Sequence, residues 1–443
     1  VVVGAGFAGL CAALEAKEVE FVMGWQKGFD GLHATPLYMR KPEDVEKLIW
    51  GPLNVHSLAT YLPLFKGKKV GIVVKGCDSR GVVELLQENL INREDVVVFG
   101  MGCNGTIDIN RVLAKIGDVT EVESVTGSGA TLKVRADGKD YEFAMQDVAQ
   151  DKCRACTVPN AVIHDHFAGS PTNIPDGAQP AMPAIMTFLD GLSLEDRMGF
   201  WRGHIDRCIR CYACRNACPM CVCRDNCVAD SREPHWLTQE DSPTQKMFFQ
   251  LIHAMHLAGR CTGCGECNRA CPMGIPVGAL KLQMGRVVKK LFEYAPGMDV
   301  DAVPPLLGLM NRMRLDRRAV ACALAFGHKA PYITIPFGFG LIFQRVIADN
   351  LSENGLSVTV KDVTAANWSI GVAMLIGLFI AVFVLYRKPR DYHDIEADTS
   401  AAEVISEKLE YRHYVMLAAA IVVAVVQVIS QDLALSALCG LII

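Results

Sequence analysis

Two stretches of the sequence place cysteines at the same spacing, C-x2-C-x2-C-x3-C, each followed by proline. Two copies of a pattern this long argue against a chance match. Three thiolates within one short turn can bind three irons of one cubane, while the fourth cysteine starts a helix that leads to the neighbouring cluster. The spacing therefore predicts two 4Fe-4S clusters with crossed ligands. One is expected on Cys208, Cys211, Cys214 and Cys271, and the other on Cys261, Cys264, Cys267 and Cys218.

The other uses of clustered cysteines fit the sequence less well. Of the 18 cysteines, 11 lie between Cys208 and Cys271. A structural zinc site needs four ligands, usually in two separated C-x2-C pairs, and leaves the extra cysteines and both prolines unexplained. Disulfide-stapled secreted domains are usually shorter than about 80 residues. We therefore expect reduced thiolates that hold metal in a cytoplasmic compartment.

Seven further cysteines raise separate questions. Cys77 and Cys103 each follow an apolar run of strand length, which places both at the carboxyl edge of neighbouring parallel strands. The pair Cys153-x2-Cys156 supplies two more thiolates, so these four are expected to form a third 4Fe-4S site, the alternative being four unconnected buried cysteines. Gly76 and Gly102 are expected to let the backbone approach that cluster. Spacing does not decide whether the remaining three are neighbours of a cluster, ligands of another centre or free thiols: Cys221, Cys223 and Cys227.

The first residues carry a weaker signal. Gly4, Gly6 and Gly9 follow Val1–Val3 in the G-x-G-x-x-G pattern of a dinucleotide-binding turn, which resembles the start of an FAD-dependent flavoprotein. The continuation departs from that family, because the next candidate strand, Glu20–Met23, comes early and no acidic residue stands at its end. The glycine pattern makes FAD a further candidate cofactor, although the sequence that follows it does not match the flavoprotein family.

The elements that position these cysteines can be read from the pattern of apolar residues. Residues 69–75 and 95–99 are strand-like runs on either side of a helical stretch at 81–90, which predicts a βαβ unit with parallel strands. Alternation around Asp137-Gly138 predicts a hairpin. A helix is expected at 247–258, after Ser242-Pro243 and before Gly259. His253 and His256 lie on it and are expected to be helix residues near a cluster rather than ligands.

Two apolar segments near the C-terminus are candidates for membrane spans. Ser369–Tyr386 is an 18-residue run without a charge, and Val415–Ser430 follows a polar loop. The basic residues of that loop favour the cytoplasmic side. The alternative is a pair of buried core helices, because the first run is short for a full crossing.

The fold class expected is α+β: a mixed α/β domain, an α-helical dicluster ferredoxin domain and C-terminal transmembrane helices. The expected boundaries are 1–20 for the truncated dinucleotide fingerprint, 21–167 for the α/β domain, 168–199 for a linker, 200–300 for the ferredoxin domain, 301–320 for a linker and 321–443 for a membrane region with about two spans.

Residues 21–300 resemble a known family. The stretches VGIVVKGCDSRG, KCRACTVPN, CIRCYACRNACPMCVC and CTGCGECNRACPMGIP are similar to the β-subunits of deazaflavin-dependent hydrogenases and formate dehydrogenases, in a branch fused to a heterodisulfide-reductase-like ferredoxin. The resemblance implies an electron-transfer subunit that works beside hydrogenase, formate dehydrogenase or heterodisulfide reductase subunits, or quinone-linked partners. Residues 320–443 weakly resemble a secondary transporter.

Composition limits the remaining choices. The chain has 443 residues and a net charge of −4, which gives no electrostatic footprint for nucleic acid. The function predicted is an electron-transfer subunit at the cytoplasmic face of the cell membrane, and no bond chemistry is assigned to it. The alternatives are a transporter fragment fused to an unrelated domain and a flavin-dependent oxidoreductase. The missing initiator methionine and the mixed resemblances are also compatible with a mosaic of pieces.

Overall fold

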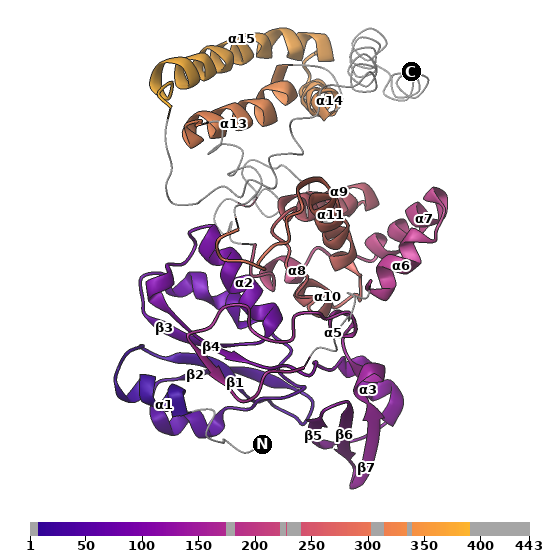
Figure 1. The fold of residues 1–443 in the computed structure, drawn as a ribbon. Coiled ribbons are helices and arrows are strands. Elements are labelled where there is room, and N and C mark those ends of the chain that lie inside the picture. Colours follow the sequence, from indigo (N-terminus) through magenta and orange to yellow (C-terminus); the bar gives the residue numbers. More distant parts are fainter. Residues whose placement is uncertain are drawn as a thin grey trace. The chain divides into compact units, whose positions relative to one another are not determined.

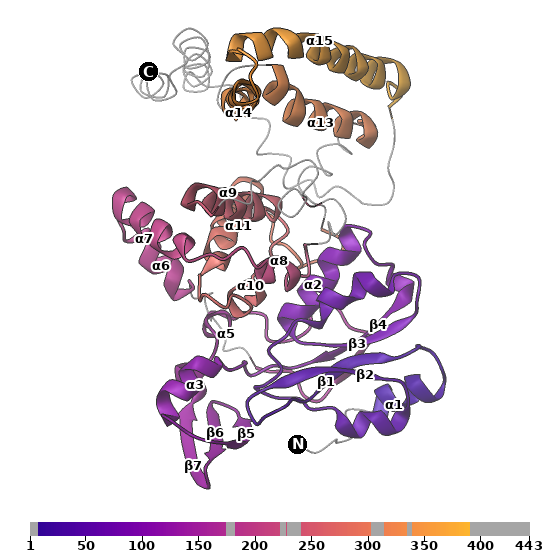
Figure 2. The same cartoon turned by 180° about the vertical axis from the view of Figure 1, so that it is seen from behind.

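The computed structural model describes residues 8–173, 182–221, 227, 241–302, 314–334 and 339–389. The chain divides into two compact units, Val1–Ala302 and Val303–Ile443, and each is treated by itself. Figure 1 shows the elements in chain order, and Figure 2 shows them from behind.

The first unit begins with a five-stranded sheet of order β2-β1-β3-β4-β8. Four of its strands are parallel, and β2 joins the edge in the antiparallel sense. Every residue of β3 and β4 is buried, as expected of central parallel strands that are covered on both faces. The strands are β1 (Val22–Lys27), β2 (Ala34–Met39), β3 (Val70–Val74), β4 (Val96–Met101) and β8 (His166–Ala168).

Helices lie on both faces of this sheet. Figure 1 shows α1 (Ala8–Glu15) on one face and α2 (Gly76–Gln87) on the other. Leu10 and Leu14 of α1 are buried in the same apolar core as β3 and β4. The predicted βαβ unit is therefore confirmed as β3-α2-β4, with α2 starting directly after β3 and not several residues later. Short 3-10 segments, Pro42–Lys47, Leu58–Phe65 and Arg93–Asp95, complete this region.

A three-stranded antiparallel meander follows with a core of its own. It consists of β5 (Val122–Ser128), β6 (Thr131–Ala136) and β7 (Lys139–Ala144), after α3 (Ile109–Ile116) and before α4 (Met145–Val148) and α5 (Asp151–Arg154). The predicted hairpin at Asp137-Gly138 is confirmed, because Ala136 pairs with Lys139 across a two-residue turn. Both turn residues have positive φ, 47° and 73°, as a type I′ turn requires.

The cysteine-rich region is helical. It comprises α6 (Ala184–Asp190), α7 (Leu194–Asp206), α8 (Ala213–Asn216), α9 (Pro243–His256), α10 (Glu266–Arg269) and α11 (Val277–Phe292). The helix expected at 247–258 is α9, and the Ser242 hydroxyl accepts a hydrogen bond from the Gln245 backbone N–H at its start. The segment expected as a linker, residues 168–199, contains regular structure. It includes α6, the first part of α7 and the last residue of β8.

The described part of the second unit contains three long helices. They are α13 (Arg317–Thr334), α14 (Phe339–Glu353) and α15 (Val360–Phe379), which continues into a π-helical turn at Ile380–Leu385. A side chain at Gly371 would meet the Thr334 side chain at 1.9 Å, so glycine lets α15 cross α13 closely.

One helix among the described residues is long and apolar enough to cross a membrane. It runs over Val360–Leu385, with mean hydropathy 2.6 and 6% of its apolar window buried. This helix contains most of the run expected at Ser369–Tyr386. The second expected span, Val415–Ser430, lies outside the described residues.

Candidate functional site

Four cysteines meet at the carboxyl edge of the central strands. Cys77 lies in the first turn of α2 just beyond β3, and Cys103 follows the neighbouring strand β4. Cys153 lies on α5, and the Cys156 backbone N–H donates to the Cys153 carbonyl, which closes a tight turn around the C-x2-C pair. We call Cys77, Cys103, Cys153 and Cys156 the edge site.

The electrostatics of the edge site show that its thiols are close neighbours. Burial raises the pKa of Cys103 to about 11, although the charge of Lys75 and the Gly105 N–H oppose the rise, and the thiols of Cys153 and Cys156 add smaller effects that raise it. Burial is also the main cause of the raised pKa of Cys77, to which Asp78 and then Cys103 add. Burial followed by Cys153 raises the pKa of Cys156. The structure thus brings together the four cysteines that the sequence analysis grouped.

Two of these sulfurs accept backbone hydrogen bonds. The Gly105 N–H lies 3.4 Å from the Cys103 Sγ, and the Thr106 N–H lies 3.3 Å from the Cys153 Sγ. Hydrogen bonds of this kind stabilise negative charge on sulfur and tune the potential of an iron-sulfur cluster.

The two ferredoxin motifs have the same local backbone. In each copy the two residues on either side of the second cysteine take positive φ: Arg210 at 48° and Tyr212 at 60°, then Gly263 at 72° and Gly265 at 71°. The third cysteine of each copy then lies in a short helix, α8 or α10. The first copy adopts this conformation without glycine, at a cost of roughly 1–2 kcal/mol per residue. Such strain is typical of a backbone held in place by a functional site.

The electrostatics of the ferredoxin cysteines connect the two motifs. The pKa of Cys264 is raised first by burial and then by Cys218, the last cysteine of the other motif. Cys218 also adds to the raised pKa of Cys261, about 11. We call Cys218, Cys261, Cys264 and Cys267 the inner site.

The remaining four form the outer site: Cys208, Cys211, Cys214 and Cys271. Burial raises the pKa of Cys214 to about 11, and the thiols of Cys267, Cys208 and Cys271 add to the rise. The Gln250 amide donates to the Cys208 Sγ at 3.6 Å, and the Ile275 N–H donates to the Cys271 Sγ at 3.4 Å.

The donor sets fit 4Fe-4S clusters. Each site offers four thiols, and all the cysteines that the structure describes are free rather than paired. Buried thiols with raised pKa values ionise favourably only beside positive charge, which iron supplies. Within the described ranges, no three side chains converge closely enough to hold a single metal ion. The four ligands of a cubane bind different irons and are spread more widely.

Two buried lysines accompany these sites. Lys152 of α5 donates to the Cys264 carbonyl at 2.6 Å and lies 3.7 Å from Glu266. Burial lowers its pKa, but Cys77 of the edge site and Glu266 outweigh this effect and raise it. Lys152 therefore lies between the edge site and the inner site. The second lysine, Lys281 of α11, is 1% exposed and lies near cysteines of the inner and outer sites.

Of the surplus cysteines, Cys221 and Cys227 are described and Cys223 lies outside the described residues. The Cys221 Sγ lies 3.1 Å from Nε2 of His253, whose other ring nitrogen is 3.9 Å from the Cys214 Sγ. Burial, and then the charge of Lys281, lower the pKa of His253 to about 2, so its ring is neutral. His256 is exposed on the same helix.

Gly76 and Gly102, which were expected to let the backbone approach a cluster, contact another part of the chain. A Cβ on Gly76 would meet the Val158 carbonyl oxygen at 1.8 Å, and a Cβ on Gly102 would meet the Ser170 carbonyl oxygen at 2.8 Å. Both glycines therefore make room for the backbone of the chain that follows Cys156. Of the fingerprint glycines, Gly9 lies in α1, and Gly4 and Gly6 lie outside the described residues.

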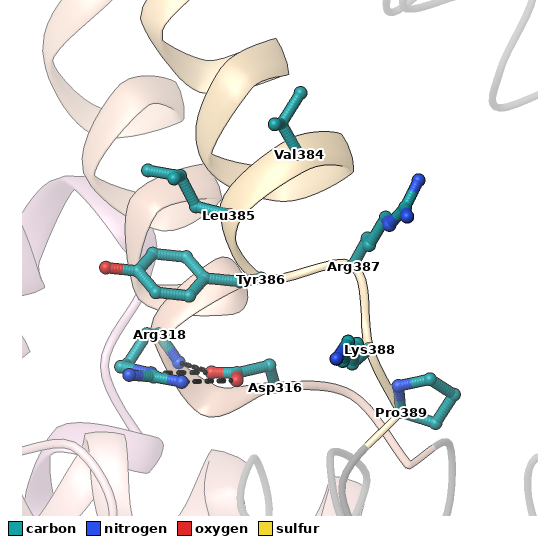
Figure 3. Close-up of a pocket in the computed structure, with 8 residues that line it drawn as sticks. All are labelled: Asp316, Arg318, Val384, Leu385, Tyr386, Arg387, Lys388 and Pro389. Carbon is teal, nitrogen blue, oxygen red and sulfur yellow. Dashed lines mark hydrogen bonds and ion pairs between the residues drawn. The ribbon is translucent and has the colours of Figure 1, made fainter.

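The second unit has a cavity of about 460 Å³ at the end of its apolar helix. Figure 3 shows Tyr386, Arg387 and Lys388 at this end of the helix, with Arg318 and Asp316 beside them. Arg318 pairs with Asp316 at 2.8 Å and stacks on the Tyr386 ring at 4.5 Å. Basic and aromatic side chains at the end of an apolar helix are typical of a membrane interface.

Together the fold and the three cysteine sites define an iron-sulfur electron-transfer subunit. A 4Fe-4S dicluster domain family matches residues 204–275, and a Na+/H+ antiporter family matches residues 323–443. The chain is 23% identical over 67% of its length to the F420-dependent formate dehydrogenase subunit beta of Methanocaldococcus jannaschii, of which the match covers 92%. The predicted resemblance to this family and the predicted 4Fe-4S dicluster are thereby confirmed.

Two further similarities, to a membrane protein and to a hydrogenase chain, differ in how strongly they support an argument. An uncharacterized membrane protein of Vibrio parahaemolyticus is 37% identical over 32% of this chain, and the match covers 32% of that protein's length. The chain thus spans about a third of the membrane proteins of this kind, and the transporter-like resemblance is confirmed over that part. A chain of the F420-reducing NiFe hydrogenase complex from Methanosarcina barkeri matches with TM-score 0.29 and 18% identity, over 34% of this chain and 58% of that one, which is too distant to support an argument.

Proposed function

We propose that the chain passes electrons through three 4Fe-4S clusters, between a flavin- or deazaflavin-linked dehydrogenase or hydrogenase and a heterodisulfide-reductase-like or quinone-linked partner. When bound, the clusters supply one-electron oxidation and reduction without making or breaking bonds in a substrate. The protein's part is to hold them in sequence and to separate them from water.

The observation that carries this proposal is the order of the three sites. Lys152 connects the edge site with the inner site, and Cys218 of the first motif raises the pKa of Cys264 in the second, which supports two neighbouring clusters with crossed ligands. Cys218 and Cys261 of the inner site also pack against the apolar core of the α/β sheet. The inner site therefore occupies the middle of the series.

The exposure of the cysteines agrees with this order. Among the twelve cysteines of the three sites, Cys156 of the edge site and Cys211 of the outer site are exposed. Every cysteine of the inner site is buried or half-buried. Electrons would enter and leave at the two ends, where partner subunits of the kinds named above can approach.

The iron content of the anaerobically purified chain tests this function. Three loaded sites predict about twelve irons and twelve sulfides per chain, and loading of the ferredoxin motifs alone predicts about eight. Flavin released on denaturation is measured in the same sample, because FAD bound near the N-terminal glycines would make the chain a flavin-dependent oxidoreductase. Stoichiometric zinc without acid-labile sulfide would overturn the proposal.

The membrane part supports a location at the cytoplasmic face. Arg387 and Lys388 directly follow the apolar helix, and basic residues favour the cytoplasmic side of a span. The match of residues 323–443 to an antiporter family favours a second candidate, a transporter-like domain carried by the same chain. Uptake of sodium or protons into vesicles containing the chain would distinguish this function from a simple anchor.

A further inference from the structure

Lys281 is a buried lysine whose ammonium group has no partner among the residues that the structure describes. It lies in the first half of α11 and is 1% exposed. Its Nζ has no hydrogen-bond partner among the described residues. An ammonium group buried without a partner is strongly destabilising, so such a residue persists only where negative charge faces it.

The groups around Lys281 identify that negative charge. Cys214 of the outer site and Cys218, Cys261 and Cys267 of the inner site lie near enough to raise its pKa, against the effect of burial. These cysteines come from both motifs. His253 of α9 also faces it, but that ring is neutral. Lys281 is therefore directed between two sets of iron ligands.

We propose that Lys281 is the shared counter-ion of the inner and outer clusters, and that it raises the reduction potentials of both. This inference rests on the proposed function. A reduced cluster carries one more negative charge than an oxidised one, so a fixed positive charge nearby favours reduction. Because one residue serves both clusters, their potentials rise together and the difference between the two potentials changes little. No bond or proton changes place in this step.

Lys152 provides a matched comparison, because it is a second buried lysine with different neighbours. Its Nζ already has the Cys264 carbonyl and Glu266 as partners, and it faces Cys77 and Cys153 of the edge site. Its charge should therefore act on the edge and inner clusters and leave the outer cluster unaffected.

The test is a redox titration followed by EPR on the 443-residue chain and on the variants Lys281→Met, Lys281→Gln, Lys281→Arg and Lys152→Met. Neutral replacements of Lys281 should make the inner and outer clusters at least about tenfold harder to reduce, which is about 59 mV for one electron. Lys281→Arg should stay close to the unmodified chain. Lys152→Met should shift the edge and inner clusters only.

Each outcome decides the question. Unchanged potentials in fully loaded Lys281→Met, or an equal shift in Lys281→Arg, would overturn the counter-ion role while leaving the electron-transfer function intact. If the Met and Gln variants lose iron and the Arg variant keeps it, positive charge is needed for the clusters to assemble, which supports the proposal. Loss of iron in all three would show a packing role instead. If the unmodified chain holds no reducible clusters, the proposed function itself fails.

Discussion

The edge site shows how single residues from distant parts of the sequence are brought together by the fold. Cys77 and Cys103 lie 26 positions apart along the chain, yet β3 and β4 pair in parallel and bring their ends together. Gly76 and Gly102 then admit the returning chain that carries the C-x2-C pair. The four thiols are close because the strand edge and this returning chain face each other.

Replacing Cys77 with serine should remove one cluster, about four of twelve irons, and leave the EPR signals of the inner and outer clusters in place. The reason is that Cys77 is a ligand of the edge site alone, whereas the ferredoxin motifs have their own ligands. Iron analysis and EPR measure the effect.

Two other cysteines serve as controls for that variant. Cys11→Ser changes a half-buried cysteine of α1 that belongs to none of the three sites, and iron should stay the same. Cys264→Ser should instead remove the inner-cluster signal. Unchanged iron and an unchanged spectrum in Cys77→Ser would mean that the edge cysteines are packing residues.

At the scale of helices and strands, the sequence predicted those elements that form because of a local residue pattern. The strands β3 and β4, the helix α9 and the turn at Asp137-Gly138 follow from short-range periodicity and turn chemistry. β8 was missed because it has three residues, His166–Ala168, and forms only by pairing with β4, which is distant in the sequence. A strand this short has no periodicity of its own.

The candidate sites follow the same division. The dicluster domain could be predicted, because the spacing of its cysteines is itself a local pattern. The burial of Lys152 and Lys281 could not be predicted. The sequence of an amphipathic helix indicates a solvated lysine, and only the packing of that helix shows that the lysine is buried. Burial of Lys281 depends on α11 packing against α9 and α10.

A contact between α2 and the segment after α11 should make stability depend on pH. The Tyr294 hydroxyl donates to Glu84 of α2 at 3.1 Å. Burial, with a smaller effect of Glu88, raises the pKa of Glu84 to about 7. Because this folded-state pKa lies above the unfolded value, Glu84 ionises at a cost in the folded state, and its contribution to stability falls as pH rises from about 4.5 to 7.

Glu84→Gln should therefore stabilise the protein at pH 8, by about 1–3 kcal/mol, and change it little at pH 4.5, where the carboxyl group is neutral in the folded state and about half ionised in the unfolded state. Hydrogen exchange of the α2 amides at the two pH values measures this difference. Equal protection of Glu84→Gln and the unmodified protein at pH 8 would contradict the assignment.

At the scale of the whole molecule, the chain combines similarity to two kinds of protein. All three cysteine sites lie within the unit Val1–Ala302, while the antiporter-like match and the apolar helix Val360–Leu385 lie in the unit Val303–Ile443. An anchor that evolved with the electron-transfer unit would be needed for coupling to a membrane partner. An accidental fusion would leave electron transfer to soluble partners unaffected by its removal.

Removing residues 303–443 should release a soluble brown protein that keeps its clusters, because every predicted iron ligand lies at or before Cys271 in a compact unit. The unmodified chain should sediment with membranes, since the helix Val360–Leu385 is apolar enough to enter lipid. A matched truncation after Pro389 retains this helix and should also stay with the membranes. Fractionation, iron analysis and electron transfer to a membrane-bound acceptor are then compared among the three proteins. If the unmodified chain is soluble and monodisperse without detergent, the membrane assignment is wrong. If the truncated soluble protein reduces the membrane-bound acceptor as fast as the unmodified chain does, the C-terminal unit has no part in coupling.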